Sequence, residues 1–286
     1  MQYWQTSRFR IPLDRPRVMG IVNVTPDSFS DGGRHYASAR SAIQHCETLL
    51  GEGADILDIG GESTRPGIEP VSLEQERQRV LPVLREALRL GVPVSVDTYK
   101  PELMREVLEL GADIINDIWG LRQPGAEEAV AGHPSCGVCI MHMHGEPRTM
   151  QRTPLQGDPV PPVLAFLRER SQALRGRGVA AERVAWDPGI GFGKTVEQNF
   201  ALLGRQQELA SDGYALLAGW SRKSSLGTVT GLAVHERVPA SVAAALLAVD
   251  RGAHAVRVHD VRDTVAALKV WQAMQSACGE QARRTT

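Results

Sequence analysis

The chain has no surplus of charge of either sign. Its 286 residues include 32 lysines and arginines and 33 aspartates and glutamates, which leaves a formal net charge of -1 at pH 7. Proteins that bind nucleic acids or anionic membrane surfaces usually present a basic field. The sequence therefore gives no reason to expect either kind of partner.

Cysteine and long hydrophobic runs are also scarce. The four cysteines, Cys46, Cys136, Cys139 and Cys278, are scattered, which favours a reducing compartment over a disulfide framework. Cys136 and Cys139 have the spacing of a redox pair, but Cys139 lies inside an apolar run, so we expect two packed thiols. No apolar run approaches transmembrane length, and the N-terminal stretch lacks the apolar core of a signal peptide. These absences predict a cytoplasmic protein.

What the chain does contain is a repeated unit of an apolar strand followed by a helix. Glycines at 53, 111 and 252 stand where a helix must end and turn into a strand, which is the expected C-cap role. Strand-like runs cover 18–24, 54–59, 92–97, 111–116, 137–142, 183–187, 215–219 and 252–259. Helical patterns cover 37–50, 73–90, 101–110, 161–177, 196–209, 240–251 and 261–277.

About eight strands, each followed by a helix, predict a single α/β domain, a (β/α)8 TIM barrel with its active site at the C-terminal ends of the strands. A doubly wound open sheet is the alternative, but it would more naturally show a phosphate-binding fingerprint after its first strand, and none is present. We assign residues 16–278 to the barrel and residues 1–15 to a segment that covers its closed end. Residues 279–286 are expected to form a flexible polar tail.

Polar residues stand at nearly every predicted strand end. In such a barrel, catalytic residues come from these ends and from the loops behind them. In chain order the ends carry Asn23, Asp58, Asp97, Asn116, the segment 141–144 (M-H-M-H), Asp187, the segment 221–224 (S-R-K-S) and the segment 257–259 (R-V-H). One or two such groups could be helix caps, but their recurrence predicts a functional site at one mouth of the barrel.

The residues Asp97, Asn116 and Asp187 are expected to project into one cavity from strands three, four and six. Two carboxylates and an amide can hydrogen-bond adjacent N–H donors on a small ligand, and the amino-pyrimidinone edge of a pterin or a guanine has this pattern. Helix N-capping is the alternative, because Asp and Asn suit the position just past a strand.

Cationic residues stand on strands seven and eight, after which these barrels most often bind phosphate. Lys223 follows the seventh strand between Arg222 and Ser224, and Arg257 and His259 lie on the eighth. Cations next to a helix N-terminus predict an anion site. Asn23, opposite these groups, could supply a neutral oxygen ligand to a divalent ion that already bridges phosphate oxygens.

Three further motifs have simpler explanations than the chemistry they suggest. Residues 188–195 (P-G-I-G-F-G-K-T) end like a Walker A loop, but proline replaces its first glycine. We expect these glycines to let the backbone pass close to a flat ligand, with Phe192 offering a face. His142 and His144 lack a third metal ligand at suitable spacing. Met141 could form the floor under an aromatic ligand or simply pack in the core.

Together these motifs resemble those of the dihydropteroate synthase family over nearly the whole chain. Residues 19–33 (M-G-I-V-N-V-T-P-D-S-F-S-D-G-G) and 219–224 (G-W-S-R-K-S) are two of the matches, and the specificity lies in several long motifs in family order. Further matches are 58–67, 95–101, 115–118, 187–195 and 257–261. One position departs from the family pattern, since His144 stands where glutamine is expected.

The resemblance implies a reaction in folate synthesis. In it, 6-hydroxymethyl-7,8-dihydropterin pyrophosphate and p-aminobenzoate form 7,8-dihydropteroate and pyrophosphate. The resemblance assigns pterin binding to Asp97, Asn116, Asp187 and Lys223, and we add Met141 and Phe192 to these pterin ligands from the reading of the residues above. It assigns the pyrophosphate to Arg257, His259 and Asn23 with Mg²⁺, and the p-aminobenzoate end, where sulfonamides would compete, to Thr64, Arg65, Pro66 and Ser224.

An arylamine is a weak nucleophile, and the sequence offers no obvious base for it. We therefore expect the leaving group to depart first, with Asp97, Lys223, Arg257 and His259 as the candidate catalytic residues. Loops 25–36, with Phe29 and Asp31, and 60–72 are expected to be flexible and to close over the site.

Two rival functions share the predicted pterin pocket. A pterin-binding methyltransferase would use the Asp and Asn cluster without the cations Lys223, Arg257 and His259. A non-catalytic pterin-binding protein would not need Asn23 and two cationic strand ends either. The resemblance also implies a homodimer formed through barrel helices.

Overall fold

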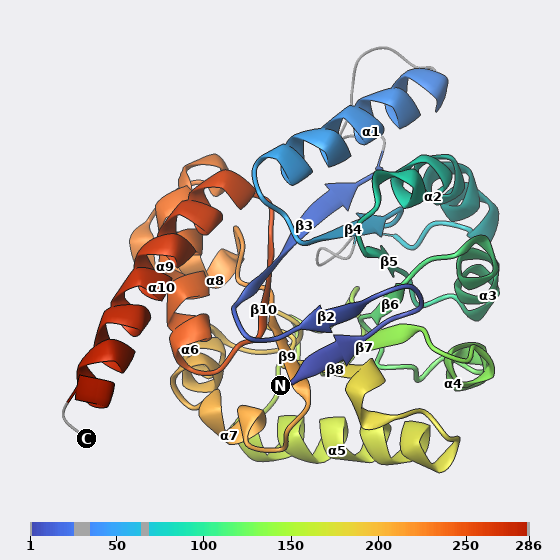
Figure 1. The fold of residues 1–286 in the computed structure, drawn as a ribbon. Coiled ribbons are helices and arrows are strands. Elements are labelled where there is room, and N and C mark those ends of the chain that lie inside the picture. The colour runs from blue at the N-terminus through green and yellow to red at the C-terminus, as the bar shows by residue number, and fades with distance from the viewer. Residues whose placement is uncertain (1, 26–34, 64–68, 285–286) are drawn as a thin grey trace.

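The computed structural model describes residues 2–25, 35–63 and 69–284, and its centre is a closed barrel of eight parallel strands ringed by helices (Figure 1). In the order in which they pair around the barrel, the strands are β10 (Ala255–Val258), β3 (Arg17–Asn23), β4 (Ile56–Gly60), β5 (Val94–Asp97), β6 (Ile114–Asp117), β7 (Gly137–Met141), β8 (Val184–Asp187) and β9 (Ala215–Ala218). The predicted (β/α)8 TIM barrel is confirmed.

The helices cover the outside of the barrel. They are α1 (His35–Gly51), α2 (Leu73–Ala87), α3 (Pro101–Leu110), α4 (Ala126–Gly132), α5 (Val160–Gly176), α6 (Val196–Gly204), α7 (Gln207–Ala210), α8 (Ser224–Thr230), α9 (Val238–Asp250) and α10 (Val261–Arg284), with the short 3-10 helices η1 (Leu88–Leu90), η2 (Ala181–Arg183) and η3 (Val234–Glu236). None of the helices within the described ranges is both long enough and apolar enough to cross a bilayer.

Helix boundaries differ from the predicted ones in three places. The pattern predicted over 196–209 forms two helices, because α6 ends at Gly204, a poor helix former. The seven-residue helices α4 and α8 were not predicted, since so few turns leave no clear helical periodicity. A flexible tail was predicted from residue 279, but α10 continues through Arg284. A single glycine costs a helix only about 1 kcal/mol, and the following Gln, Ala and Arg favour helix.

Side chains on the strands alternate between two apolar clusters. Outward-facing residues such as Val22 and Leu57 pack in the large core that also contains helix residues. Inward-facing residues such as Met19, Ile56 and Ile114 form a separate cluster inside the barrel. Because side-chain direction alternates along a strand, the next inward positions toward the C-terminal ends are free to carry polar groups.

The buried cysteines belong to this packing. Cys46, Cys136 and Cys139 are free and buried, and burial raises the pKa of the Cys136 thiol above its ordinary value. The prediction that Cys136 and Cys139 are packed thiols is therefore confirmed.

The N-terminal segment forms an antiparallel hairpin of β1 (Tyr3–Gln5) and β2 (Arg10–Pro12) that lies across one end of the barrel (Figure 1). Trp4 and Ile11 belong to the inner cluster, so they close the barrel interior at the end opposite the strand C-termini. The Trp4 indole Nε1 donates a hydrogen bond of 3.0 Å to the carbonyl oxygen of Arg183, just before β8.

We expect Trp4→Ala to lower the free energy of unfolding by about 3–5 kcal/mol, because it opens a cavity at the closed end of the barrel. Trp4→Phe keeps most of the buried ring and loses only the indole donor, so its loss should be about 1 kcal/mol plus a small cavity term. Urea unfolding of the two variants measures both values. Equal losses in the two variants would contradict the role of packing.

Candidate active site at the barrel mouth

The strand register brings the predicted pterin ligands to one level of the barrel. Asp97 on β5 pairs with Asn116 on β6, and Asp187 on β8 pairs with Met141 on β7. All of these residues occupy inward-facing positions at the C-terminal ends of their strands. The predicted convergence of Asp97, Asn116 and Asp187 on one cavity therefore agrees with the fold.

Arg257 joins the predicted heterocycle ligands to the predicted anion ligands. Its guanidinium Nε donates to Asp58 Oδ2 at 2.6 Å, and its Nη2 donates to Asp97 Oδ2 at 2.8 Å. The anionic and cationic groups thus share one rim, as the sequence predicted. In this state, however, the arginine is paired with carboxylates and is not a free anion clamp.

Asp58 is the residue that the assignment of site roles missed. Its side chain is completely buried, and besides pairing with Arg257 it accepts hydrogen bonds of 3.4 and 3.3 Å from the Asn116 amide. The signal was present in the sequence, because Asp58 stands at the end of a strand like the residues that were chosen. Through these contacts Asp58 orients the side chains of both Arg257 and Asn116.

Burial dominates the electrostatics of the carboxylates. It raises the pKa of Asp97 to about 7, with Arg257 opposing the rise. Burial also raises the pKa of Asp187. The hydrogen bond from the Gly189 N–H and the positive charges of Lys223 and Arg257 oppose this rise. A ligand that offers N–H donors to these carboxylates would favour their ionised forms.

Lys223 stands between the carboxylates and an aromatic face. Its ammonium lies 4.4 Å from the centroid of the Phe192 ring. Burial lowers the pKa of Lys223 to about 8, while the charge of Asp187 opposes that shift. Phe192 and Met141 belong to one small apolar cluster at the mouth, together with Ile118, which sequence reasoning had not selected. This cluster gives a flat ligand an apolar surface beside the carboxylates.

The remaining predicted anion ligands lie on neighbouring strand ends. His259 Nδ1 is 3.0 Å from Ser221 Oγ, and Ser221 Oγ accepts the His259 backbone N–H at 3.1 Å, so this serine fixes the ring. Ser224, which was predicted to contact p-aminobenzoate, is the exposed first residue of α8.

Asn23, the predicted Mg²⁺ ligand, ends β3 beside Gly60 of β4. Its side chain forms no hydrogen bond with another described residue. The described residues include no group of three His, Cys, Asp or Glu side chains that could hold a metal by themselves. These residues fit a Mg²⁺ ion whose other ligands are water and substrate phosphates, since this ion commonly keeps such ligands.

Two positions of the loop 188–193 require glycine because neighbouring backbone lies close to them. Gly189 and Gly193 have positive φ, and a Cβ added to them would lie 1.9 Å from the His142 carbonyl oxygen and 2.1 Å from the His144 carbonyl oxygen. The close passage of the loop after β7 therefore requires glycine at both positions. Phe192 does present its ring to the mouth, where it faces Lys223.

The predicted p-aminobenzoate ligands Thr64, Arg65 and Pro66, and the loop residues Phe29 and Asp31, lie outside the described residues. Among the described residues, Lys100 Nζ contacts both Glu62 Oε2, at 2.6 Å, and the buried carboxylate of Glu76. Glu62 also accepts a hydrogen bond of 3.0 Å from the Tyr99 hydroxyl and one of 3.3 Å from the Val71 N–H. This cluster ties the connection after β4 to the residues that follow Asp97.

Comparison with known proteins agrees with this site. A family model described as pterin binding enzyme matches residues 19–259. A dihydropteroate synthase of Neisseria meningitidis serogroup B is 52% identical, over 95% of this chain and 97% of that protein. A Burkholderia cenocepacia dihydropteroate synthase, solved in complex with 7,8-dihydropteroate, is 52% identical with a TM-score of 0.90 and covers 98% of each chain. A Xanthomonas albilineans dihydropteroate synthase, solved with 4-aminobenzoic acid, is 48% identical with a TM-score of 0.89, over 96% of this chain and 99% of that chain.

We expect Lys100→Met to lower the free energy of unfolding by about 3–5 kcal/mol near pH 8, because the buried carboxylate of Glu76 would then lose its cation. Lys100 lowers the pKa of Glu76 against the effect of burial, so without Lys100 that carboxyl would be protonated more easily at low pH. The loss should therefore be smaller at pH 5 than at pH 8. Urea unfolding at the two pH values measures it, and Lys100→Met with Glu76→Gln, which removes one buried charge, should recover part of the loss. A loss that does not change with pH would contradict this account.

Proposed function

Since this chain belongs to the dihydropteroate synthase family of pterin-binding enzymes, we propose that it joins 6-hydroxymethyl-7,8-dihydropterin pyrophosphate to p-aminobenzoate. The products are 7,8-dihydropteroate and pyrophosphate. The observation that best supports these substrates is the shared rim, where Arg257 contacts the carboxylate of Asp97. A ligand with an N–H-rich heterocycle and an anionic tail is complementary to this arrangement.

In the proposed complex, Asp97, Asn116 and Asp187 bind the amino-pyrimidinone edge of the pterin. Asp97 Oδ2 already accepts a hydrogen bond from Arg257, so an arriving pterin would exchange one donor for another. It would not have to desolvate a bare carboxylate, which is the larger energetic barrier to binding. Phe192 supplies the apolar face beneath the ring plane.

Pyrophosphate departure is proposed to precede attack by the amine. As the bond between the pterin methylene and the pyrophosphate oxygen breaks, negative charge grows on the oxygen and positive charge on the pterin methylene. Arg257, His259 and Lys223 would stabilise the departing anion, and the ionised Asp97 and Asp187 would stabilise the cation. A Mg²⁺ ion held by Asn23 and the phosphates would supply further positive charge to the leaving group. The p-aminobenzoate nitrogen then forms the new C–N bond and loses a proton to solvent.

Pyrophosphate release tests this function against its rivals. The proposal predicts release that requires Mg²⁺ and is accompanied by an equal amount of dihydropteroate when p-aminobenzoate is present. A pterin-dependent methyltransferase or a non-catalytic pterin-binding protein would bind the dihydropterin and release no pyrophosphate. Sulfonamides, which resemble p-aminobenzoate, should compete with it. Dihydropterin binding without pyrophosphate release would overturn the proposal.

We expect Asp97→Asn to lower kcat/KM by on the order of 10²-fold or more, because one preorganised negative charge beside the cationic intermediate is lost. The measurement is steady-state pyrophosphate release at saturating p-aminobenzoate. Asp158→Asn is a matched control, since Asp158 is exposed before α5 and pairs only with Arg205 among the described side chains. A rate for Asp97→Asn close to that of the control would overturn the proposed stabilisation of the cation.

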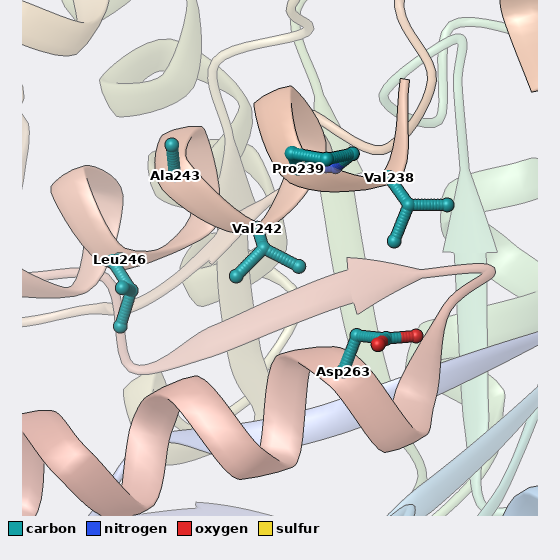
Figure 2. Close-up of a pocket in the computed structure, with 6 residues that line it drawn as sticks. All are labelled: Val238, Pro239, Val242, Ala243, Leu246 and Asp263. Atoms are coloured by element: carbon teal, nitrogen blue, oxygen red, sulfur yellow. The ribbon is translucent and has the colours of Figure 1, made fainter. Parts of the chain in front are cut away.

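The chain is also proposed to act as a homodimer in the cytoplasm. Among the described residues, the exposed large hydrophobic side chains are Val229, Val234, Leu247, Val270 and Met274. All of them belong to α8, η3, α9 and α10, and these three α-helices lie side by side in Figure 1. Figure 2 shows the pocket between α9 and α10, which is lined by Pro239, Val242 and Leu246 of α9 and by Asp263 of α10. Such an apolar face on one side of a barrel supports self-association.

We expect the double variant Val270→Glu with Met274→Glu to be monomeric, because it places charges in the apolar face that a second copy would cover. Sedimentation velocity measures the change against the wild-type dimer. Ala180→Glu, an exposed site outside this face, serves as the control and should leave the dimer intact. A wild-type protein that sediments as a monomer would refute the proposed dimer.

A further inference from the structure

Lysine is rare in this chain, and its positions are unusual. Only four of the 32 lysines and arginines are lysines: Lys100, Lys194, Lys223 and Lys269. Lys269 is exposed on α10, while Lys100 and Lys223 belong to the clusters at the barrel mouth described above. Lys194 is only 2% exposed, and neither the reaction nor the proposed substrate contacts assign it a role.

The Lys194 ammonium is enclosed by backbone carbonyl groups. Its Nζ donates hydrogen bonds to the carbonyl oxygens of Gly189 at 2.9 Å, Phe192 at 3.1 Å and His142 at 3.2 Å. An ammonium has three N–H donors, so this cage satisfies all of them. A planar guanidinium could not direct its donors at three converging oxygens in this way, which explains a lysine where the chain otherwise prefers arginine.

This cage fixes two residues of the proposed pterin pocket. The Gly189 carbonyl oxygen belongs to the cage, and the Gly189 N–H donates a hydrogen bond of 2.7 Å to Asp187 Oδ1. The Phe192 carbonyl oxygen also belongs to the cage, and the Phe192 ring contacts the Lys223 ammonium. The third acceptor, His142, directly follows the end of β7, so Lys194 joins the loops after β7 and β8.

The charge of Lys194 is placed to act on the same carboxylate. Burial lowers the pKa of Lys194 to about 7, and the charge of Asp187 opposes that shift. In return Lys194, together with Lys223 and Arg257, lowers the pKa of Asp187 against the effect of burial. The buried thiol of Cys139 also interacts with Asp187, and burial raises the pKa of this thiol well above its ordinary value.

We propose that Lys194 is a positioning residue for the pterin half of the reaction, holding Asp187 and Phe192 in the geometry that receives the heterocycle. It acts through the loop 188–193 and does not contact the substrate. This inference rests on the proposed function, because it presumes that the ligand of Asp187 is a dihydropterin.

The test compares Lys194→Met, which keeps the side-chain length and removes the charge and all three donors, with Lys269→Met at the exposed site. Binding of 6-hydroxymethyl-7,8-dihydropterin should weaken by about tenfold or more in Lys194→Met, as is typical when a group that orients a ligand-binding residue is lost. Binding of inorganic pyrophosphate with Mg²⁺, and the KM for p-aminobenzoate, should stay at the values of the Lys269→Met control. This split separates positioning of the pterin ligands from general loss of folded protein.

The pH dependence gives a second readout. Removing the Lys194 charge should raise the pKa of Asp187, so dihydropterin binding by Lys194→Met should be lost at a higher pH on the acid side than in the wild type. Lys194→Arg keeps the charge and loses the fit to the three carbonyl oxygens. It should therefore bind the dihydropterin more weakly without this shift in pH, and it also serves if Lys194→Met does not fold.

Three outcomes would overturn the inference. They are dihydropterin binding by Lys194→Met equal to that of Lys269→Met, equal weakening of dihydropterin and pyrophosphate binding, or wild-type binding by Lys194→Arg. Failure of the proposed function would look different, because the wild-type protein itself would then not bind the dihydropterin.

Discussion

The barrel mouth depends on the burial of carboxylates together with cations. Asp58 and Asp187 are buried in one rim together with Asp97, whose side chain is 11% exposed, and burying a carboxylate costs free energy unless a cation or a hydrogen-bond donor compensates it. Arg257 pairs with two of them, and Lys223 faces the third from the next strand end. Breaking any such pair leaves an uncompensated buried charge, which is why the group behaves as one unit.

The same unit explains how one site can serve both ends of a substrate. Carboxylate oxygens at the floor accept N–H donors, and the cations that pair with them also form the nearest positive charge for an anionic tail. Since both sets are fixed on strand ends of a closed barrel, they require little reorganisation when charge develops in a reaction. The ion pairs that offset the cost of burying these carboxylates therefore consist of the same groups that act on the substrate.

Rigid support for this unit comes from loops that are fastened by buried lysines. Lys194 holds the loop after β8 through three carbonyl oxygens, and Lys100 holds the connection after β4 through two glutamates. The glycines at 189 and 193 make the first arrangement possible, because any side chain there would collide with the neighbouring backbone. At the other end of the barrel, Trp4 closes the interior so that the mouth is its open side.

Much of this was accessible from the amino-acid sequence, because the information is local. Alternation of apolar runs with helical patterns predicted the eight-stranded barrel, and polar residues at strand ends predicted which mouth carries the site. Only the tertiary structure decided which partner each polar group takes. Arg257 pairs with Asp58, which is 199 positions away in the sequence. The carbonyl cage of Lys194 includes His142, which is 52 positions away. Such contacts follow from barrel closure and strand register, which bring together side chains that no local pattern relates.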